Sequence, residues 1–242
     1  MSSNPNPDPS STVPGGNASP SGGSTVDLDQ YLHTGAGQPA QPEPAHATLV
    51  MPEAHRICLV GVLADDSGSM CGLEQAVIEG LNLSVEAFRG AKGSDFFLDV
   101  RGFHGTLFRG ALKDVQDGSF NTYGTGGNTP LVSHAISLLK ELHAKAEQYR
   151  NLGIPATVAL LLVTDGLPEG DEAAPDEFPK HVQAGDYVVG MGIAGHEAHV
   201  ATFKALFQAM GIAKVVTPRA AAAEVRHAIN QFSQSVASIA AA

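Results

Sequence analysis

The side chains best suited to chemistry in this chain are carboxylates and hydroxyls placed at the ends of apolar runs. Asp65, Ser67 and Ser69 closely follow one such run, and Asp165 follows another. Thr129 ends a glycine-rich stretch just before a predicted helix. Two carboxylates and three hydroxyls form a set of hard oxygen ligands, which suits Mg²⁺, Mn²⁺ or Ca²⁺ better than zinc or copper. Because Mg²⁺ seldom takes a full cage of protein ligands, the set predicts a metal site that keeps an open position.

Two residues beside these ligands favour their close approach to one ion. Gly68 separates the two serines and lets the backbone fold tightly, so that both hydroxyls face one point. Pro130 follows Thr129 and is favourable at the first position of a helix. We therefore expect a helix to begin directly at the threonine ligand.

Strand and helix patterns alternate after Arg56. Continuous apolar runs, such as 57–64 and 157–163, are typical of strands buried on both faces of a sheet. Apolar residues at helical spacing mark the segments between them. The predicted strands are 57–64, 96–103, 106–112, 157–163, 187–193 and 214–217, and the predicted helices are 73–88, 131–142, 200–210 and 220–239.

The element order βαββαβ(α)βαβα predicts the fold class. It is a three-layer α/β domain with a mostly parallel central sheet, one short antiparallel edge strand and helices on both faces. In open α/β sheets, ligands bind beyond the carboxyl ends of the strands, where the strand order reverses. The three loops that carry the candidate ligands are expected to meet there.

Three stretches of this chain resemble the von Willebrand factor A (vWA) family. LVGVLADDSGSM, GTGGNTPL and LLLVTDG match that family's metal-ion-dependent adhesion site (MIDAS), D-x-S-x-S with a distant Thr and a distant Asp. The resemblance implies a Rossmann-like vWA domain over about residues 56–240. It implies that the serines bind the ion directly and that Thr129 and Asp165 bind it directly or through water. It also implies that the open position takes a Glu or Asp carboxylate from a protein partner. Among relatives, the chain looks most like the bacterial intracellular type, similar to tellurite-resistance and stress-response vWA proteins.

Residues 1–50 differ in composition from the predicted domain. They are rich in Pro, Ser and Gly and contain no Lys or Arg, so we expect a disordered arm. A short cluster interrupts this composition at 26–32, with Val26, Leu28, Tyr31 and Leu32 around two aspartates. It is either a random cluster in a linker or a docking peptide, which would allow self-association through residues 26–32.

Charge and cysteine usage limit the partners and the compartment. The formal net charge is −11 and no basic stripe is present, which argues against nucleic acid and anionic membrane as partners. The start of the chain has no secretory signal pattern, and no run approaches the length of a membrane helix. Cys58 and Cys71 form no disulfide framework. We expect a soluble cytoplasmic protein.

Three functions are compatible with these features. The first is metal-dependent protein binding, as an adaptor or scaffold. The alternative is a structural subunit of a large assembly, such as a phage particle, in which the arm contacts neighbours. A metal-dependent phosphohydrolase is a third, but Ser67 stands where the aspartyl-phosphate pattern needs a second Asp, two residues after Asp65, and the stretch 124–130 lacks a P-loop Lys. We therefore expect no enzyme activity.

The histidines and one acidic loop are expected to lie outside the metal site. GHEAH lacks the H-E-x-x-H spacing, and the other histidines are scattered. His104 is the exception, because its hairpin could bring it to the metal rim. Asp66 is expected to have a structural or solvated role. Loop 166–179 is expected to be solvated or to select the partner by charge.

Overall fold

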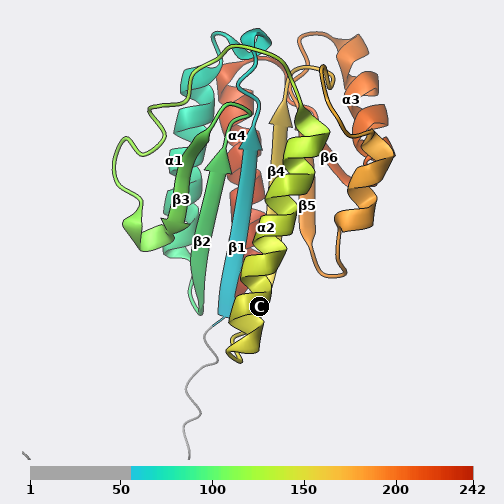
Figure 1. Ribbon diagram of the computed structural model, residues 1–242. Helices are drawn as coiled ribbons and strands as arrows, with labels where there is room; N and C mark the ends of the chain where they lie inside the picture. The colour runs from blue at the N-terminus through green and yellow to red at the C-terminus, as the bar shows by residue number, and fades with distance from the viewer. Residues whose placement is uncertain (1–55, 242) are drawn as a thin grey trace, which may run out of the picture. The chain divides into compact units, whose positions relative to one another are not determined.

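A six-stranded sheet forms the centre of residues 56–241, which are the residues that the computed structural model describes (Figure 1). The strand order is β3-β2-β1-β4-β5-β6. The strands are β1 (Arg56–Ala64), β2 (Ser94–Arg101), β3 (Thr106–Ala111), β4 (Ala156–Thr164), β5 (Tyr187–Gly192) and β6 (Lys214–Val216). The predicted arm of residues 1–50 and its cluster at 26–32 lie outside the described residues.

The sheet is mostly parallel because helical crossovers connect its central strands. β1 pairs in parallel with β2 and β4, and the ladder continues in parallel through β5 to β6. Only β3 runs antiparallel, paired with β2 at the edge. β1 and β4 are buried along almost their whole length, as their unbroken apolar sequences require. The predicted fold class is confirmed.

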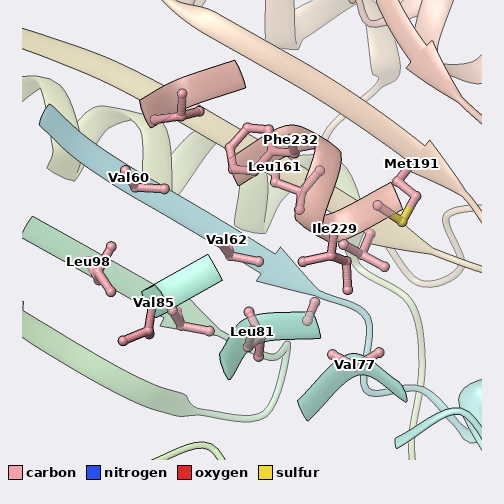
Figure 2. Packing of buried hydrophobic residues seen from close by; sticks show 14 of the residues in the cluster. Val60, Val62, Val77, Leu81, Val85, Leu98, Leu161, Met191, Ile229 and Phe232 are labelled. Atoms are coloured by element: carbon pink, nitrogen blue, oxygen red, sulfur yellow. The ribbon is translucent and has the colours of Figure 1, made fainter. Parts of the chain in front are cut away.

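Four α-helices cover the two faces of this sheet. One face packs against α1 (Glu74–Gly90) and α4 (Ala222–Ala241), and the other against α2 (Leu131–Asn151) and α3 (Glu197–Ala209). Figure 2 shows the first layer, where Val60 and Val62 of β1 lie among side chains of α1 and α4 such as Leu81 and Ile229. The helices thus fill both sides of the sheet and leave its carboxyl edge to the loops.

The layer of α3 depends on glycines in β5. A Cβ atom at Gly192 would lie 2.3 Å from Cγ of Phe203, so the ring packs where only a glycine leaves room. Gly190 leaves room for Phe207 in the same way, and both rings are almost fully buried. These contacts fix α3 beside the end of β5, next to the carboxyl edge of the sheet.

Several element ends differ from the prediction, most of them by a few residues, whereas α2 continues nine residues beyond its predicted end at 142. β2 ends at Arg101 rather than at 103, because Phe103 turns its backbone N–H to Asp66. Pro130 is the N-cap residue of α2, and the first helical residue is Leu131. The optional helix between β4 and β5 is a 3₁₀ helix, η4 (Pro175–His181), which ends the acidic loop. Shorter 3₁₀ turns follow β1 (η2, Gly68–Met70) and β3 (η3, Leu112–Asp114).

No helix in the described part of the chain is long and apolar enough to cross a membrane. The cytoplasmic location stays a prediction.

Candidate metal centre

Asp65 lies fully buried where β1 ends. Its Oδ1 accepts a hydrogen bond from the backbone N–H of Ser67 at 2.8 Å, and its Oδ2 accepts one from the Thr164 hydroxyl at 2.6 Å. Its own backbone N–H donates to the Val163 carbonyl at 2.8 Å. The carboxylate is therefore fixed at the junction of β1 and β4, where the strand order reverses (Figure 1).

Hydroxyl groups connect the loop after β1 with the loop after β4. The Oγ atoms of Ser67 and Ser69 are 3.0 Å apart, and the Ser69 hydroxyl donates to Oδ1 of Asp165 at 2.5 Å. Ser69 and Asp165 are 96 positions apart in the sequence. Three of the five predicted ligands thus form a continuous series of hydrogen-bonded oxygen atoms at the carboxyl edge of the sheet, and Asp65 joins this series through the backbone N–H of Ser67.

Thr129 faces the same group from the loop before α2. A Cβ atom at Gly166 would lie 3.6 Å from Oγ1 of Thr129 and 3.8 Å from Oγ of Ser69. The backbone carbonyl of Thr129 accepts a hydrogen bond from Glu169 N–H at 3.1 Å, which joins its loop to the loop after β4. All five predicted residues therefore meet at one end of the sheet, as the order of elements requires.

No Lys or Arg within residues 56–241 balances the two carboxylates of this group, although the imidazole of His199 lies close enough to Asp165 to lower its pKa. Neither Asp65 nor Asp165 forms an ion pair with a Lys or Arg of that range. Burial raises the pKa of Asp165; the hydrogen bond from Ser69 lowers it, and the charge of Asp65 adds to the rise. Buried charges are ordinarily paired or bound to a metal. The chemistry of the donor set therefore fits a divalent cation.

Asp66 points away from this group and has a structural role. Its Oδ1 accepts hydrogen bonds from Phe103 N–H at 2.8 Å and from Nδ1 of the His104 ring at 2.9 Å. Its backbone carbonyl accepts from Gly126 N–H at 2.6 Å. A Cβ atom at Gly127 would lie 2.3 Å from Nε2 of His104, so the imidazole rests on the loop that carries the threonine. Asp66 thus ties the β2–β3 turn to the candidate centre.

Two acidic residues support the segments on either side of Thr129, and one of them belongs to the acidic loop 166–179 that was expected to be solvated or to select the partner by charge. Asp171, in the acidic loop, accepts hydrogen bonds from the backbone N–H groups of Val132 and Ser133, the latter at 3.0 Å. It therefore caps α2, whose N-cap residue makes no side-chain hydrogen bond. Glu74, at the start of α1, accepts a hydrogen bond from the Thr125 hydroxyl at 3.0 Å.

A buried tyrosine also supports the end of β1. The Tyr123 hydroxyl donates to the backbone carbonyl of Asp65. Burial raises the pKa of Tyr123, and the charge of Asp65 raises it further, so the phenol stays protonated and can donate.

Histidine metal chemistry finds no support in the described residues. No group of three His, Cys, Asp or Glu side chains that could hold a metal occurs among residues 56–241. The candidate centre differs from such a group because three of its five oxygen donors are hydroxyls. His196 and His199 do pack together, with ring centroids 3.7 Å apart, at the start of α3.

Comparison with solved structures shows how widely this fold occurs. The chain is similar to the pilus adhesin SpaC from Lactobacillus rhamnosus GG, with a TM-score of 0.54, 15% identity and coverage of 77% of this chain and 30% of the adhesin. It is similar to the PilB minor pilin from Streptococcus sanguinis, with a TM-score of 0.53, 12% identity and coverage of 75% and 61%. The likeness shows the fold. Proximal thread matrix protein 1 from the mussel byssus, solved with a zinc-occupied MIDAS motif, matches with a TM-score of 0.51, 14% identity and coverage of 78% and 47%.

The chain spans between 30% and 61% of the length of these three structures, so it corresponds to a part of each. No family model and no curated protein matches it.

Proposed function

We propose that residues 56–241 form a metal-dependent protein-binding domain, an adaptor or scaffold that holds a partner's acidic group through a divalent cation. The cation ligands are Asp65, Ser67, Ser69, Thr129 and Asp165. The observation that carries the proposal is the hydrogen-bonded series from Ser67 through Ser69 to Asp165. It joins two distant loops at a point where two carboxylates have no Lys or Arg partner among residues 56–241.

Each ligand has a distinct role in this proposal. Ser67 and Ser69 contribute hydroxyl oxygens on a tight turn, and Asp165 contributes a carboxylate from the neighbouring strand. Asp65 is held by hydrogen bonds to both of its oxygens, so it orients the turn and supplies negative charge. When bound, the cation supplies a positive charge that attracts a carboxylate at short range in a partly dry site. Hydroxyl ligands leave much of that charge unneutralised.

The oxygen donor set favours Mg²⁺, with Mn²⁺ or Ca²⁺ as alternatives. The zinc-occupied MIDAS motif of the mussel thread protein supports a divalent cation at this position of the fold. The family resemblance supports the same assignment and the relation to bacterial tellurite-resistance vWA proteins.

A protein is the partner class that we propose. The adhesin and the minor pilin with the same fold support a role in protein interactions. The net charge of −11 disfavours nucleic acid and anionic membrane surfaces as partners. A bound divalent cation would place a local positive charge on this acidic chain, where one acidic group of a protein can bind.

A pull-down with the full chain as bait tests this function. We expect a partner to be retained in Mg²⁺, released by chelator, and not retained by Asp165→Ala. Asp117→Ala is the matched control, because Asp117 is an exposed aspartate in a turn outside the candidate centre. A partner held equally well in Mg²⁺ and in chelator would reject metal-mediated recognition.

The pilus and byssus proteins with this fold also favour the alternative of an assembly subunit. Light scattering of the full chain and of a chain lacking residues 1–48 tests it, because an assembly that depends on the arm should contain fewer subunits after the deletion.

We also propose that the domain is not an enzyme. Asp66, the second strand-end carboxylate, is occupied by the β2–β3 turn, which supports this view. Metal-dependent release of phosphate from a phosphomonoester would contradict it.

A further inference from the structure

A groove leads from the candidate metal centre to the side of α3. It has a volume of about 550 Å³, within the roughly 300–1,000 Å³ typical of ligand pockets. Ser69, Thr129 and Asp165 form one end of it, and residues of the loop after β4 and of α3 form the remainder. We call it the α3 groove. Any group bound to the cation at Asp165 has this groove as its immediate neighbour.

Leu167 and Pro168 form an apolar part of the wall that the loop after β4 contributes to the groove. Leu167 is 52% exposed although it lies two residues from Asp165, and Pro168 follows it. Phe203, from α3, also lines the groove and is held in place by its contact with Gly192. A single exposed leucine needs no explanation by itself. Here the leucine lines the same groove as three of the candidate cation ligands.

The polar side chains of the groove define the charge that it accepts. His199 lies on the α3 side, where its ring packs edge-on against Phe203 with centroids 6.2 Å apart. An imidazole N–H donates a hydrogen bond in either protonation state. Glu169, an exposed residue of the loop that also carries Leu167, repels a second acidic group. The groove therefore suits one carboxylate at the cation and an uncharged neighbour beyond it.

We propose that the α3 groove binds a partner segment in which a single carboxylate stands next to an aliphatic or aromatic side chain. The carboxylate lies at the cation, and the apolar side chain packs on Leu167 and Pro168. This inference rests on the proposed cation site. It adds a sequence preference that a metal alone does not have, because the cation selects the acid and the groove selects its neighbour.

Three acetylated, amidated hexapeptides test the proposal against the full chain in Mg²⁺, with affinity measured from NMR shift changes. Their sequences are Ser-Gly-Glu-Leu-Gly-Ser, Ser-Gly-Glu-Ser-Gly-Ser and Ser-Gly-Gln-Leu-Gly-Ser. Partial burial of one leucine side chain predicts about tenfold tighter binding of the Glu-Leu peptide than of the Glu-Ser peptide. Leu167→Ser abolishes this preference and leaves Mg²⁺ affinity unchanged. Leu152→Ser, which alters a 75% exposed leucine at the end of α2, keeps the preference.

The outcomes separate this inference from the function on which it rests. Equal, Mg²⁺-dependent affinities for the Glu-Leu and Glu-Ser peptides overturn the groove and leave the cation site intact. Equal affinities for the Glu-Leu and Gln-Leu peptides overturn carboxylate recognition itself. No binding of any peptide also rejects the groove. A mass that doubles in Mg²⁺ and returns to the monomer value in Leu167→Ser would assign the groove to a second copy of the chain and overturn the proposed partner.

Discussion

Asp171 offers a sharp test of how the candidate centre is held together. Its carboxylate accepts hydrogen bonds from the backbone N–H groups of Val132 and Ser133, in the first turn of α2 and shortly after Thr129. Loss of a capping side chain costs about 0.5–2 kcal/mol. We expect Asp171→Ala to lower the free energy of unfolding in chelator by about 1–2 kcal/mol, because two charge-assisted hydrogen bonds are lost.

The same substitution should weaken metal binding without removing a ligand. Groups that orient metal ligands typically contribute about 10–100-fold to metal affinity. Because Asp171 fixes the backbone that follows Thr129, we expect a loss of Mg²⁺ affinity at the lower end of that range in isothermal titration calorimetry. Asp171→Asn retains an acceptor oxygen and should recover part of both losses.

Glu172→Ala is the matched control, since Glu172 is the adjacent acidic residue in the same loop and is exposed. Chemical denaturation in chelator gives the stability of each variant, and calorimetry gives its affinity. If Asp171→Ala unfolds at the same denaturant concentration as Glu172→Ala and binds Mg²⁺ equally well, the proposed support of the threonine loop is wrong.

Two further predictions concern the loops and the core around the centre. Burial raises the pKa of Cys58 to about 11, whereas Cys71 is exposed, so a thiol reagent at about pH 8 should modify only Cys71 in the native chain and both cysteines after unfolding. Rapid native labelling of both would show that β1 is not buried as described. Gly102→Ala should destabilise the protein by about 1–3 kcal/mol, because the new Cβ would lie 2.2 Å from Oδ2 of Asp66. Gly105→Ala, in the same turn and with nothing within 4 Å, should change thermal stability little, and equal melting temperatures for the two variants would contradict the packing of Asp66.

The fold was predictable because its signals are local and repeated. Unbroken apolar runs identify β1 and β4 as central strands, and helical spacing identifies the segments that cover them. The order of these elements then leaves few possible topologies. The end of the short edge strand β6 and both ends of β2 depend on tertiary contacts, so the predicted bounds differ by one residue for β6 and by two for β2.

The ligands were predictable for a related reason, whereas their supports were not. Asp65 and Asp165 end adjacent parallel strands, so the topology alone brings them together. Asp171, Glu74 and Tyr123 act through contacts with distant backbone or side chains, and no local pattern marks such partners.

Asp99 is another residue whose role the sequence did not indicate. It lies in the apolar run of β2 and is 1% exposed, where an unpaired charge would be costly. The structure pairs it with Arg101 at 2.6 Å and with Arg109 of β3 at 3.3 Å. The second pair spans the only antiparallel ladder of the described sheet, so the partner becomes evident only once the hairpin register is known.

Thermal unfolding of the full chain and of Asp165→Asn, each in chelator and in Mg²⁺, tests the central claim most directly. At about 100 times its dissociation constant, a ligand adds about 2.7 kcal/mol, which is about 5–10 °C for a domain of this size. We predict such a rise for the unaltered chain and none for Asp165→Asn. The variant should be at least as stable in chelator, because it removes a half-buried charge. An equal Mg²⁺-induced rise in both proteins, or no rise in the unaltered chain, would contradict the account.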